Sequence, residues 1–432
     1  MNGSCLSWDQ SLLAVAFGNP NDEHERIKCY RVVLSPSSAS ATPLKKTSGG
    51  TITATNGENT SSATTIDLQL RCTLVKGSSV GASTATSPST TAKASEEPSS
   101  GEWALHRMYF VGTSNNFLLC CYRGRHSSGS NTGTSMMLLL WDLTRGVICQ
   151  RQSVMQQQQQ HQVTFMDCCL SSTDNTILHI LFHDKASHKY IIYEYAFTDS
   201  TSKSDGNQEQ RQYLRLIRKI KAGSSRISSP TTNNEVSTDA SSWQQQRITS
   251  NSTYISTLLP HKDSTHSKLQ FIDAVSGKRV KFKSSSSVRS SSECCSISSM
   301  KQSNAIIVVY LTQTDNANNN INTAYAVDVC EYKKDDDGND DDDDDATSPK
   351  KSHVRLSTKH TYEGLTSLPT CFVAISNKDH ATNNNSSDNN NNNNMVVTCN
   401  DGNFFVCIDN KMEHTTVANT STSTLLDRKS VV

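Results

Sequence analysis

"MMLLLWDLTRG", residues 136–146, is the stretch of this 432-residue sequence that decides its fold. An apolar run ends in Trp141 and Asp142, and a glycine, Gly146, closes the stretch. A short apolar run bounded by turn residues is typical of a buried β-strand that leads into a tight turn. We therefore expect a strand that ends at Asp142 and a reversal of the chain at Gly146.

Apolar runs of the same kind form six groups along the chain. Within a group, a polar turn such as "WDQS" (8–11) or "SSTDNT" (171–176) links the first run to the second. The third run ends in an acid or arginine next to apolar or aromatic residues, as in "FIDAVSGK" (271–278). Four short antiparallel strands repeated in this order are typical of a β-propeller blade. The sequence thus predicts an all-β propeller with six recognisable blades, or seven, and another all-β fold is the alternative.

Long polar segments separate many of these runs. They are rich in Ser, Thr, Asn, Gln or Asp and carry few residues that could contribute to a core. Because the cost of closing a loop grows slowly with its length, we expect insertions in loops of one domain. The prediction is a propeller over 1–412 and a polar tail over 413–432, with insertions at 35–62, 77–101, 155–162, 199–210, 224–250, 333–352 and 377–394.

Charge and cysteine content narrow the functional classes. The 41 basic and 41 acidic residues balance, so no global charge attracts nucleic acid or membrane. The 14 cysteines include no C-x-x-C pair, which disfavours zinc fingers and redox motifs and predicts reduced cysteines in a cytosolic or nuclear protein. No apolar stretch approaches the ~18 residues of a membrane span. We expect no membrane partner.

Catalytic motifs are missing from the sequence. It contains no G-x-S-x-G, P-loop, dinucleotide-binding or H-E-x-x-H pattern. His179 and His183 lie four residues apart, but on a strand that spacing is ~13 Å, too far for two ligands of one metal ion. The prediction is therefore a chain that is not an enzyme, with no catalytic residue, no metal, no cofactor and no small-molecule substrate.

Two basic stretches fall on expected outer strands. They are "RLIRKIKAG" (215–223) and "KRVKFK" (278–283). Such residues can contact phosphates, and a solvated blade edge is the alternative interpretation. The candidate phosphate contacts are Arg215, Arg218, Lys219, Lys221, Lys278, Arg279, Lys281 and Lys283.

The stretch "LLLWDLTRG" resembles the third strand and following turn of a WD repeat, and "FIDAVSGK" is a weaker copy. In that family the tryptophan packs between blades, the aspartate caps a tight turn and the glycine leads into the outer strand. The resemblance implies these structural roles for Trp141, Asp142, Gly146, Asp273 and Gly277. The family's Gly-His dipeptide is missing from every group.

Residues 163–228 are similar to the Utp-type WD-repeat subunits of the small-subunit processome, although the helical C-terminal domain of those proteins is absent here. The resemblance implies a non-catalytic scaffold for ribosomal small-subunit biogenesis in the nucleus and nucleolus. Its partners would be other proteins of a multi-subunit complex, with pre-rRNA reached indirectly. The alternative function is a WD-repeat adaptor in another complex, for ubiquitin ligation, trafficking or chromatin. The alternative location is the cytoplasm.

Overall fold

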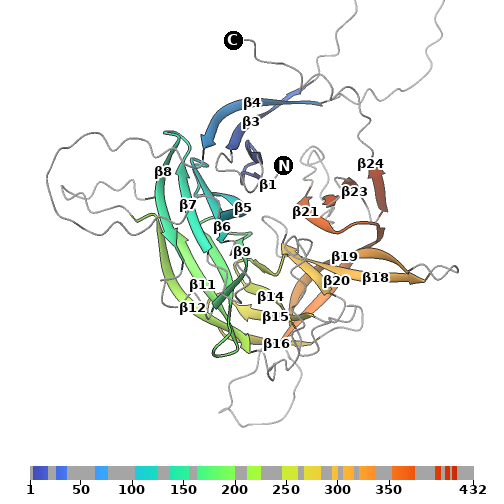
Figure 1. Ribbon diagram of the computed structural model, residues 1–432. Helices are drawn as coiled ribbons and strands as arrows, with labels where there is room; N and C mark the ends of the chain where they lie inside the picture. Colours follow the sequence, from blue (N-terminus) through green and yellow to red (C-terminus); the bar gives the residue numbers. More distant parts are fainter. Residues whose placement is uncertain are drawn as a thin grey trace, which may run out of the picture. The chain divides into compact units, whose positions relative to one another are not determined.

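The structure of the protein is a computed structural model in which every described element is a β-strand (Figure 1). The all-β class predicted from the sequence is confirmed. The described residues contain no helix, and hence none that could cross a membrane. They are 3–17, 26–36, 64–75, 103–124, 136–154, 163–199, 212–224, 246–260, 267–283, 294–299, 305–315, 321–335, 353–374, 395–399, 404–408 and 411–415.

The chain divides into two compact units, Met1–Gln158 and Gln159–Val432, and each is described by itself. The first unit holds two sheets of four antiparallel strands in chain order. One consists of β1 (Gly3–Leu6), β2 (Leu12–Phe17), β3 (Arg26–Pro36) and β4 (Thr64–Val75). The other consists of β5 (Trp103–Val111), β6 (Phe117–Gly124), β7 (Met136–Asp142) and β8 (Val147–Ser153).

The second unit holds three sheets. The first consists of β9 (Val163–Leu170), β10 (Ile177–Asp184), β11 (Lys189–Phe197) and β12 (Leu214–Ser224). The second has eight strands: β13 (Ile248–Ser250), β14 (Tyr254–Pro260), β15 (Ser267–Asp273), β16 (Arg279–Lys283), β17 (Cys294–Ser299), β18 (Ala305–Asp315), β19 (Ile321–Asp335) and β20 (His353–Leu365). The third consists of β21 (Pro369–Ala374), β22 (Met395–Cys399), β23 (Phe404–Ile408) and β24 (Lys411–Thr415).

Within each unit, consecutive sheets pack face to face through apolar cores. In the first unit, Leu12, Ala14 and Ile27 of one sheet share a core with Leu118 and Trp141 of the other. In the second unit, Leu181 and Ile220 share a core with Ile255 of the eight-stranded sheet, and Val309 of that sheet shares a core with Val397 of the third. Four-stranded meanders that stack in sequence order are organised as the blades of a β-propeller are.

The eight-stranded sheet corrects the predicted number of blades. Lys281–Lys283 of β16 pair in parallel with His353–Arg355 of β20, which joins two consecutive four-stranded meanders into one sheet. The described chain therefore has five sheets where six or seven separate blades were predicted. An outer strand carries unpaired N–H and C=O groups that a second outer strand can satisfy, and no local pattern in the sequence reports such a pairing.

The predicted insertions fall mostly between strands. Those at 77–101, 155–162 and 377–394 lie outside the described residues. Three other predicted insertions overlap with strands: β3 extends into 35–62, β13 into 224–250 and β19 into 333–352. The strand β24 crosses the predicted domain boundary at residue 412.

Candidate functional site

The turn after β7 is organised by Asp142. Its Oδ1 accepts hydrogen bonds from the backbone N–H of Thr144 at 2.9 Å and of Arg145 at 3.3 Å, and from the Thr144 hydroxyl at 2.5 Å. The Gly146 N–H donates to the Asp142 carbonyl at 2.8 Å, with φ of 68° at the glycine. Burial raises the pKa of Asp142, but these hydrogen bonds outweigh it and hold the pKa below the usual 3.8.

The turn after β15 has the same geometry. The Ser276 N–H donates to Asp273 Oδ1 at 2.6 Å, and the Gly277 N–H donates to the Asp273 carbonyl at 2.9 Å. The backbone N–H and hydroxyl of Ser276 lower the pKa of Asp273. Gly277 has φ of 67°.

A third copy of this turn was missed in the sequence because no glycine closes it. After β10, Asp184 accepts hydrogen bonds from the backbone N–H of Ala186 at 3.0 Å and of Ser187 at 3.3 Å. His188, with φ of 50°, occupies the place that Gly146 and Gly277 occupy in the other two turns. The signal that could have found it is the aspartate three residues before a serine, as in the Asp273 turn.

Trp141 lies in the core shared by the two sheets of the first unit, with 1 % of its surface exposed. Its cross-strand neighbours are Leu118 on β6 and Ile148 on β8. The indole Nε1 is buried without a hydrogen-bond partner in the described part of the chain. Trp141 therefore contributes packing alone, and the positions of Trp141, Asp142 and Gly146 are those of a structural turn.

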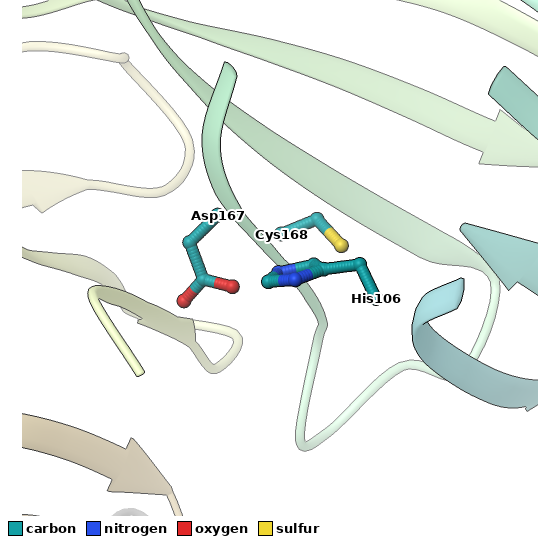
Figure 2. Close-up of side chains that lie close together, drawn as sticks. All are labelled: His106, Asp167 and Cys168. Carbon is teal, nitrogen blue, oxygen red and sulfur yellow. The ribbon is translucent and has the colours of Figure 1, made fainter. Parts of the chain in front are cut away.

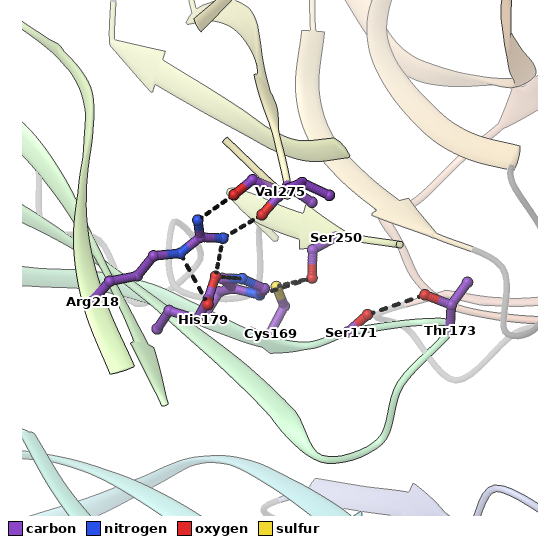
Figure 3. A network of polar contacts seen from close by, with 9 residues as sticks. Cys169, Ser171, Thr173, His179, Arg218, Ser250 and Val275 are labelled. Carbon is purple, nitrogen blue, oxygen red and sulfur yellow. Dashed lines mark hydrogen bonds and ion pairs between the residues drawn. The ribbon is translucent and has the colours of Figure 1, made fainter. Parts of the chain in front are cut away.

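Arg218, one of the candidate phosphate contacts, is engaged inside the second unit. Its guanidinium donates to both carboxylate oxygens of Glu194, at 3.0 and 2.9 Å (Figure 3). It also donates to the backbone carbonyl of Val275 at 2.6 Å and to that of Ala274. Since these groups belong to the next sheet's β15–β16 turn, Arg218 connects two sheets and is not available to a phosphate.

Glu194 is the centre of a row of polar side chains. His179 Nε2 lies 3.0 Å from Glu194 Oε2, and His179 Nδ1 lies 3.0 Å from the Ser250 hydroxyl on β13. Cys169 Sγ lies 3.6 Å from the same hydroxyl (Figure 3). Burial raises the pKa of Glu194, but hydrogen bonds from His179 and Arg218 outweigh it, so the pKa lies below 4.5. We name this set of residues the Glu194 row.

The other basic side chains divide between the two outer strands. Arg215, Lys219 and Lys221 are exposed on β12, and the Lys219 ammonium lies 4.7 Å from the centre of the Tyr193 ring. Lys278, Arg279 and Lys281 are exposed on and before β16, and the side chain of Lys283 lies outside the described part. The structure brings the first three together on one strand.

Asp167 and Cys168 are successive residues of β9 (Figure 2). The Asp167 carboxylate is buried and accepts a hydrogen bond of 2.7 Å from the backbone N–H of Arg247. Asp167 thereby ties β9 to the residue that precedes β13.

His183, the second histidine of the strand 177–184, does not join His179. Its ring stacks on the ring of Tyr190, with 4.7 Å between the ring centres.

A pocket of about 520 Å³ lies in the first unit, where β3 and β4 meet the turn between β5 and β6. We name it the arginine pocket, because Arg31 and Arg71 are among the residues that line it. A volume of 300–1,000 Å³ is typical of ligand sites. Its lining consists of Asp9, Ser11, Leu12, Arg31, Gln69, Leu70, Arg71, Ser114, Asn115 and Asn116.

A β-bulge places Arg71 in this pocket. The pairing between β3 and β4 shifts between Cys29 and Tyr30, so Cys72 and Leu70 have partners and Arg71 is the extra residue. Bulges often re-aim a side chain next to a functional site. Here the Arg71 guanidinium donates to Asn116 Oδ1 at 3.2 Å. Arg31, on β3, is exposed at the same pocket.

Asn115 contributes a buried acceptor to the lining. Its side chain is 7 % exposed, and its Oδ1 has no hydrogen-bond partner among the described residues. A buried polar atom without a partner costs about 1–3 kcal/mol, so a donor supplied by a ligand would stabilise it. Asn115 has φ of 52°, a conformation that asparagine tolerates better than most residues.

Asp9 is the acidic residue of the pocket lining, and its carboxylate accepts hydrogen bonds from neighbouring serines. The hydroxyls of Ser7 and Ser11 donate to it at 2.7 and 2.8 Å. Burial raises the pKa of Asp9, but the hydrogen bonds from both serines outweigh it and lower the pKa. Asp9 is therefore anionic at neutral pH and is held by the two serines.

Sequence reasoning missed this pocket. Its residues come from four segments separated by polar insertions, and none of them belongs to a known motif. The only signal was the polar turn "WDQS", which was interpreted as a connection between strands.

No known protein family matches the sequence, and no curated protein matches it. Among solved structures, the chain is similar to the β-propeller domain of the Trilobed protease from Pyrococcus furiosus, with 8 % identity, 72 % of this chain and 82 % of that chain covered, and a TM-score of 0.32. It is also similar to an acylaminoacyl peptidase from Pyrococcus horikoshii, with 8 % identity. That match covers 96 % of this chain and 45 % of the peptidase, with a TM-score of 0.38. A third similar structure is prolyl oligopeptidase B from Galerina marginata. The identity is 9 %, the match covers 94 % of this chain and 47 % of that chain, and the TM-score is 0.34.

The chain spans less than half the length of the last two structures. These neighbours correct one prediction. A chain that is not an enzyme was predicted from the absence of catalytic motifs, whereas the similar structures are peptidases or part of a protease. That prediction is wrong, because the search for short catalytic motifs does not test for relationships at the level of the fold.

Proposed function

We propose that this chain is a β-propeller of the WD-repeat type that binds an extended segment of a partner protein through a carboxylate in the arginine pocket. The observation that carries the proposal is that two arginines line the same cavity as Asn115, whose buried Oδ1 lacks a partner among the described residues. The Asp142 turn and the buried Trp141 support the WD-repeat assignment.

The chemistry of the lining favours a peptide over a simple anion. Arg31 and Arg71 offer N–H donors, which suit a carboxylate or a phosphate. Asn115 Oδ1 requires a donor in return, and a peptide backbone carries N–H groups beside the carboxylate of Asp or Glu. A fully ionised phosphate has no donor. Leu70, which is 57 % exposed, adds an apolar contact for the rest of the segment.

The test is binding of fluorescent acidic peptides, measured by anisotropy. Arg31→Ala should weaken binding about 10- to 100-fold, the effect of losing a charge-assisted hydrogen bond of about 1.5–3 kcal/mol. Arg26→Ala is the matched control, because Arg26 is also exposed on β3 and does not line the pocket. Equal loss of binding in both variants, or no binding by the wild type, would contradict the proposal.

A second candidate function is assembly into the small-subunit processome, with partner proteins and indirectly with pre-rRNA. The observation in its favour is the row of exposed cations on β12, Arg215, Lys219 and Lys221. A protein that neutralises phosphates with such residues loses affinity as salt rises. A tagged chain should then localise to the nucleolus and co-purify with processome proteins, and replacing the three cations by alanine should lower its salt-sensitive RNA recovery. Exclusion from the nucleus would reject this candidate and leave peptide binding untouched.

A further inference from the structure

Cys29 on β3 and Cys72 on β4 stand directly opposite each other in the first sheet. Directly opposed Cα atoms in an antiparallel pair lie about 4.5–5.5 Å apart, and disulfides span about 4.4–6.8 Å. The two thiols are close enough for each to shift the pKa of the other. A disulfide could therefore close here with little movement of the backbone.

The two cysteines differ in their surroundings. Cys29 is completely buried and belongs to the apolar core, whereas Cys72 is half-buried next to Arg71. The Cys29 thiol and the Arg71 charge lower the pKa of Cys72, and burial opposes them. The Cys72 thiol and burial raise the pKa of Cys29. Because Cys72 is half-buried beside Arg71 and Cys29 is completely buried, an oxidant reaches Cys72 first, and Cys29 is the resolving partner.

The pairing distinguishes these two cysteines from the others. In the described strand pairings, Cys29 and Cys72 are the two cysteines that face each other, and Cys5 and Cys120 stand opposite Ala14 and Met108. Cys371, which is exposed, stands opposite Thr398. The half-buried Cys72 therefore has a second cysteine in register, which Cys371 does not have.

We propose that Cys29 and Cys72 are a redox-modification site that forms a reversible disulfide across β3 and β4 when the protein meets a peroxide. The site is independent of what the arginine pocket binds. A disulfide between residues 29 and 72 would also lock the β-bulge that carries Arg71, because Cys72 is the next residue along β4.

The reaction with hydrogen peroxide balances in two steps. The Cys72 thiolate attacks one peroxide oxygen, the O–O bond breaks, hydroxide leaves and a sulfenic acid forms on Cys72. The Cys29 sulfur then attacks the Cys72 sulfur, the S–S bond forms, and the Cys29 proton leaves with the sulfenic oxygen as water. Two thiols lose two electrons, and the peroxide is reduced to water. A thiol reductant reverses the change.

The experiment uses the full chain, reduced and then exposed to hydrogen peroxide, with peptide mapping under non-reducing conditions. The expected product is a peptide pair joined through Cys29 and Cys72 that disappears on treatment with dithiothreitol. In Cys29→Ser the resolving thiol is lost, so Cys72 should accumulate as a sulfenic acid that dimedone traps. Cys371→Ser is the control and should leave the linked pair unchanged.

A second measurement protects the test against variants that fold poorly. In the wild type, iodoacetamide should label Cys72 before oxidation and at least ten times more slowly after it, with Cys371 labelled equally in both states. Oxidation of Cys371 while Cys29 and Cys72 remain unlinked would overturn the proposal. So would linkage of Cys72 to Cys5 or Cys120 in preference to Cys29.

Discussion

In the first unit, one row of side chains across the sheet β5–β8 is apolar throughout: Phe110, Leu118, Trp141 and Ile148 stand side by side. In the second unit, the corresponding row across β9–β12 is Cys169, His179, Glu194 and Arg218. Both rows face a neighbouring sheet. The apolar row gains stability from area removed from water, whereas the Glu194 row needs every member to satisfy the others.

Similar four-stranded sheets are thus joined in two ways, by apolar packing and by charged hydrogen bonds. Apolar packing tolerates the loss of a partner by leaving a cavity, at a cost that follows its volume. A charged row leaves an unpaired charge when one member is removed, while removal of both partners together costs less. The two interfaces should therefore respond differently to single and double substitutions.

The largest effect is expected at Trp141. Trp141→Ala should lower the free energy of unfolding by about 3–5 kcal/mol, the range for a large buried aromatic residue. Trp141→Phe should cost much less, because the indole N–H has no hydrogen-bond partner to lose in the described chain. Urea denaturation followed by circular dichroism measures both. A wild-type midpoint in Trp141→Ala would show that the side chain is exposed.

Glu194→Ala should come next, at about 2–4 kcal/mol, because it removes the carboxylate that pairs with the Arg218 charge and contacts His179. The double variant Glu194→Leu with Arg218→Met should be more stable than Glu194→Ala alone. Glu331→Ala is the control, since its ion pair with Lys359 at 3.1 Å is 42 % exposed on both sides and should matter by less than about 1 kcal/mol. Additive losses in the double variant would show that the row is not coupled.

A smaller effect distinguishes the Asp142 turn from the Asp184 turn. Gly146→Ala should cost about 1–2 kcal/mol, because φ of 68° strains any residue with a Cβ atom. His188→Gly should change stability by less than about 0.5 kcal/mol, because relief of the strain at φ of 50° is offset by the greater freedom of glycine in the unfolded chain. Thermal unfolding of the two variants compares them, and a neutral Gly146→Ala would argue against a left-handed residue there.

The smallest effect is the acid response of the Glu194 row. The pKa of Glu194 is lower in the folded state than its usual 4.5, so its contribution is complete above about pH 4.5 and is lost as the pH falls through the folded pKa. Wild-type stability should therefore fall more steeply in this acid range than that of Glu194→Gln. Denaturant titrations at a series of pH values make the comparison, and parallel curves would mean that Glu194 titrates normally.

The strands and their order could be predicted from the sequence. Each strand is a local apolar run with turn residues at its ends, and local patterns need no knowledge of the rest of the chain. The turn at Asp142 was predicted for the same reason, since Asp142, Thr144 and Gly146 lie within five residues. The Asp184 turn was missed because a histidine adopts the conformation that glycine was expected to supply.

The all-β class, the recurring meander and the Asp142 turn could be predicted from residues that are neighbours along the chain. Tertiary structure alone decided that β16 pairs with β20, that Arg218 binds Glu194 and that Arg71 meets Asn116. It also decided that Cys72 faces Cys29 across two strands. Each of these contacts joins residues that are distant in sequence, and the local pattern around one partner does not identify the other.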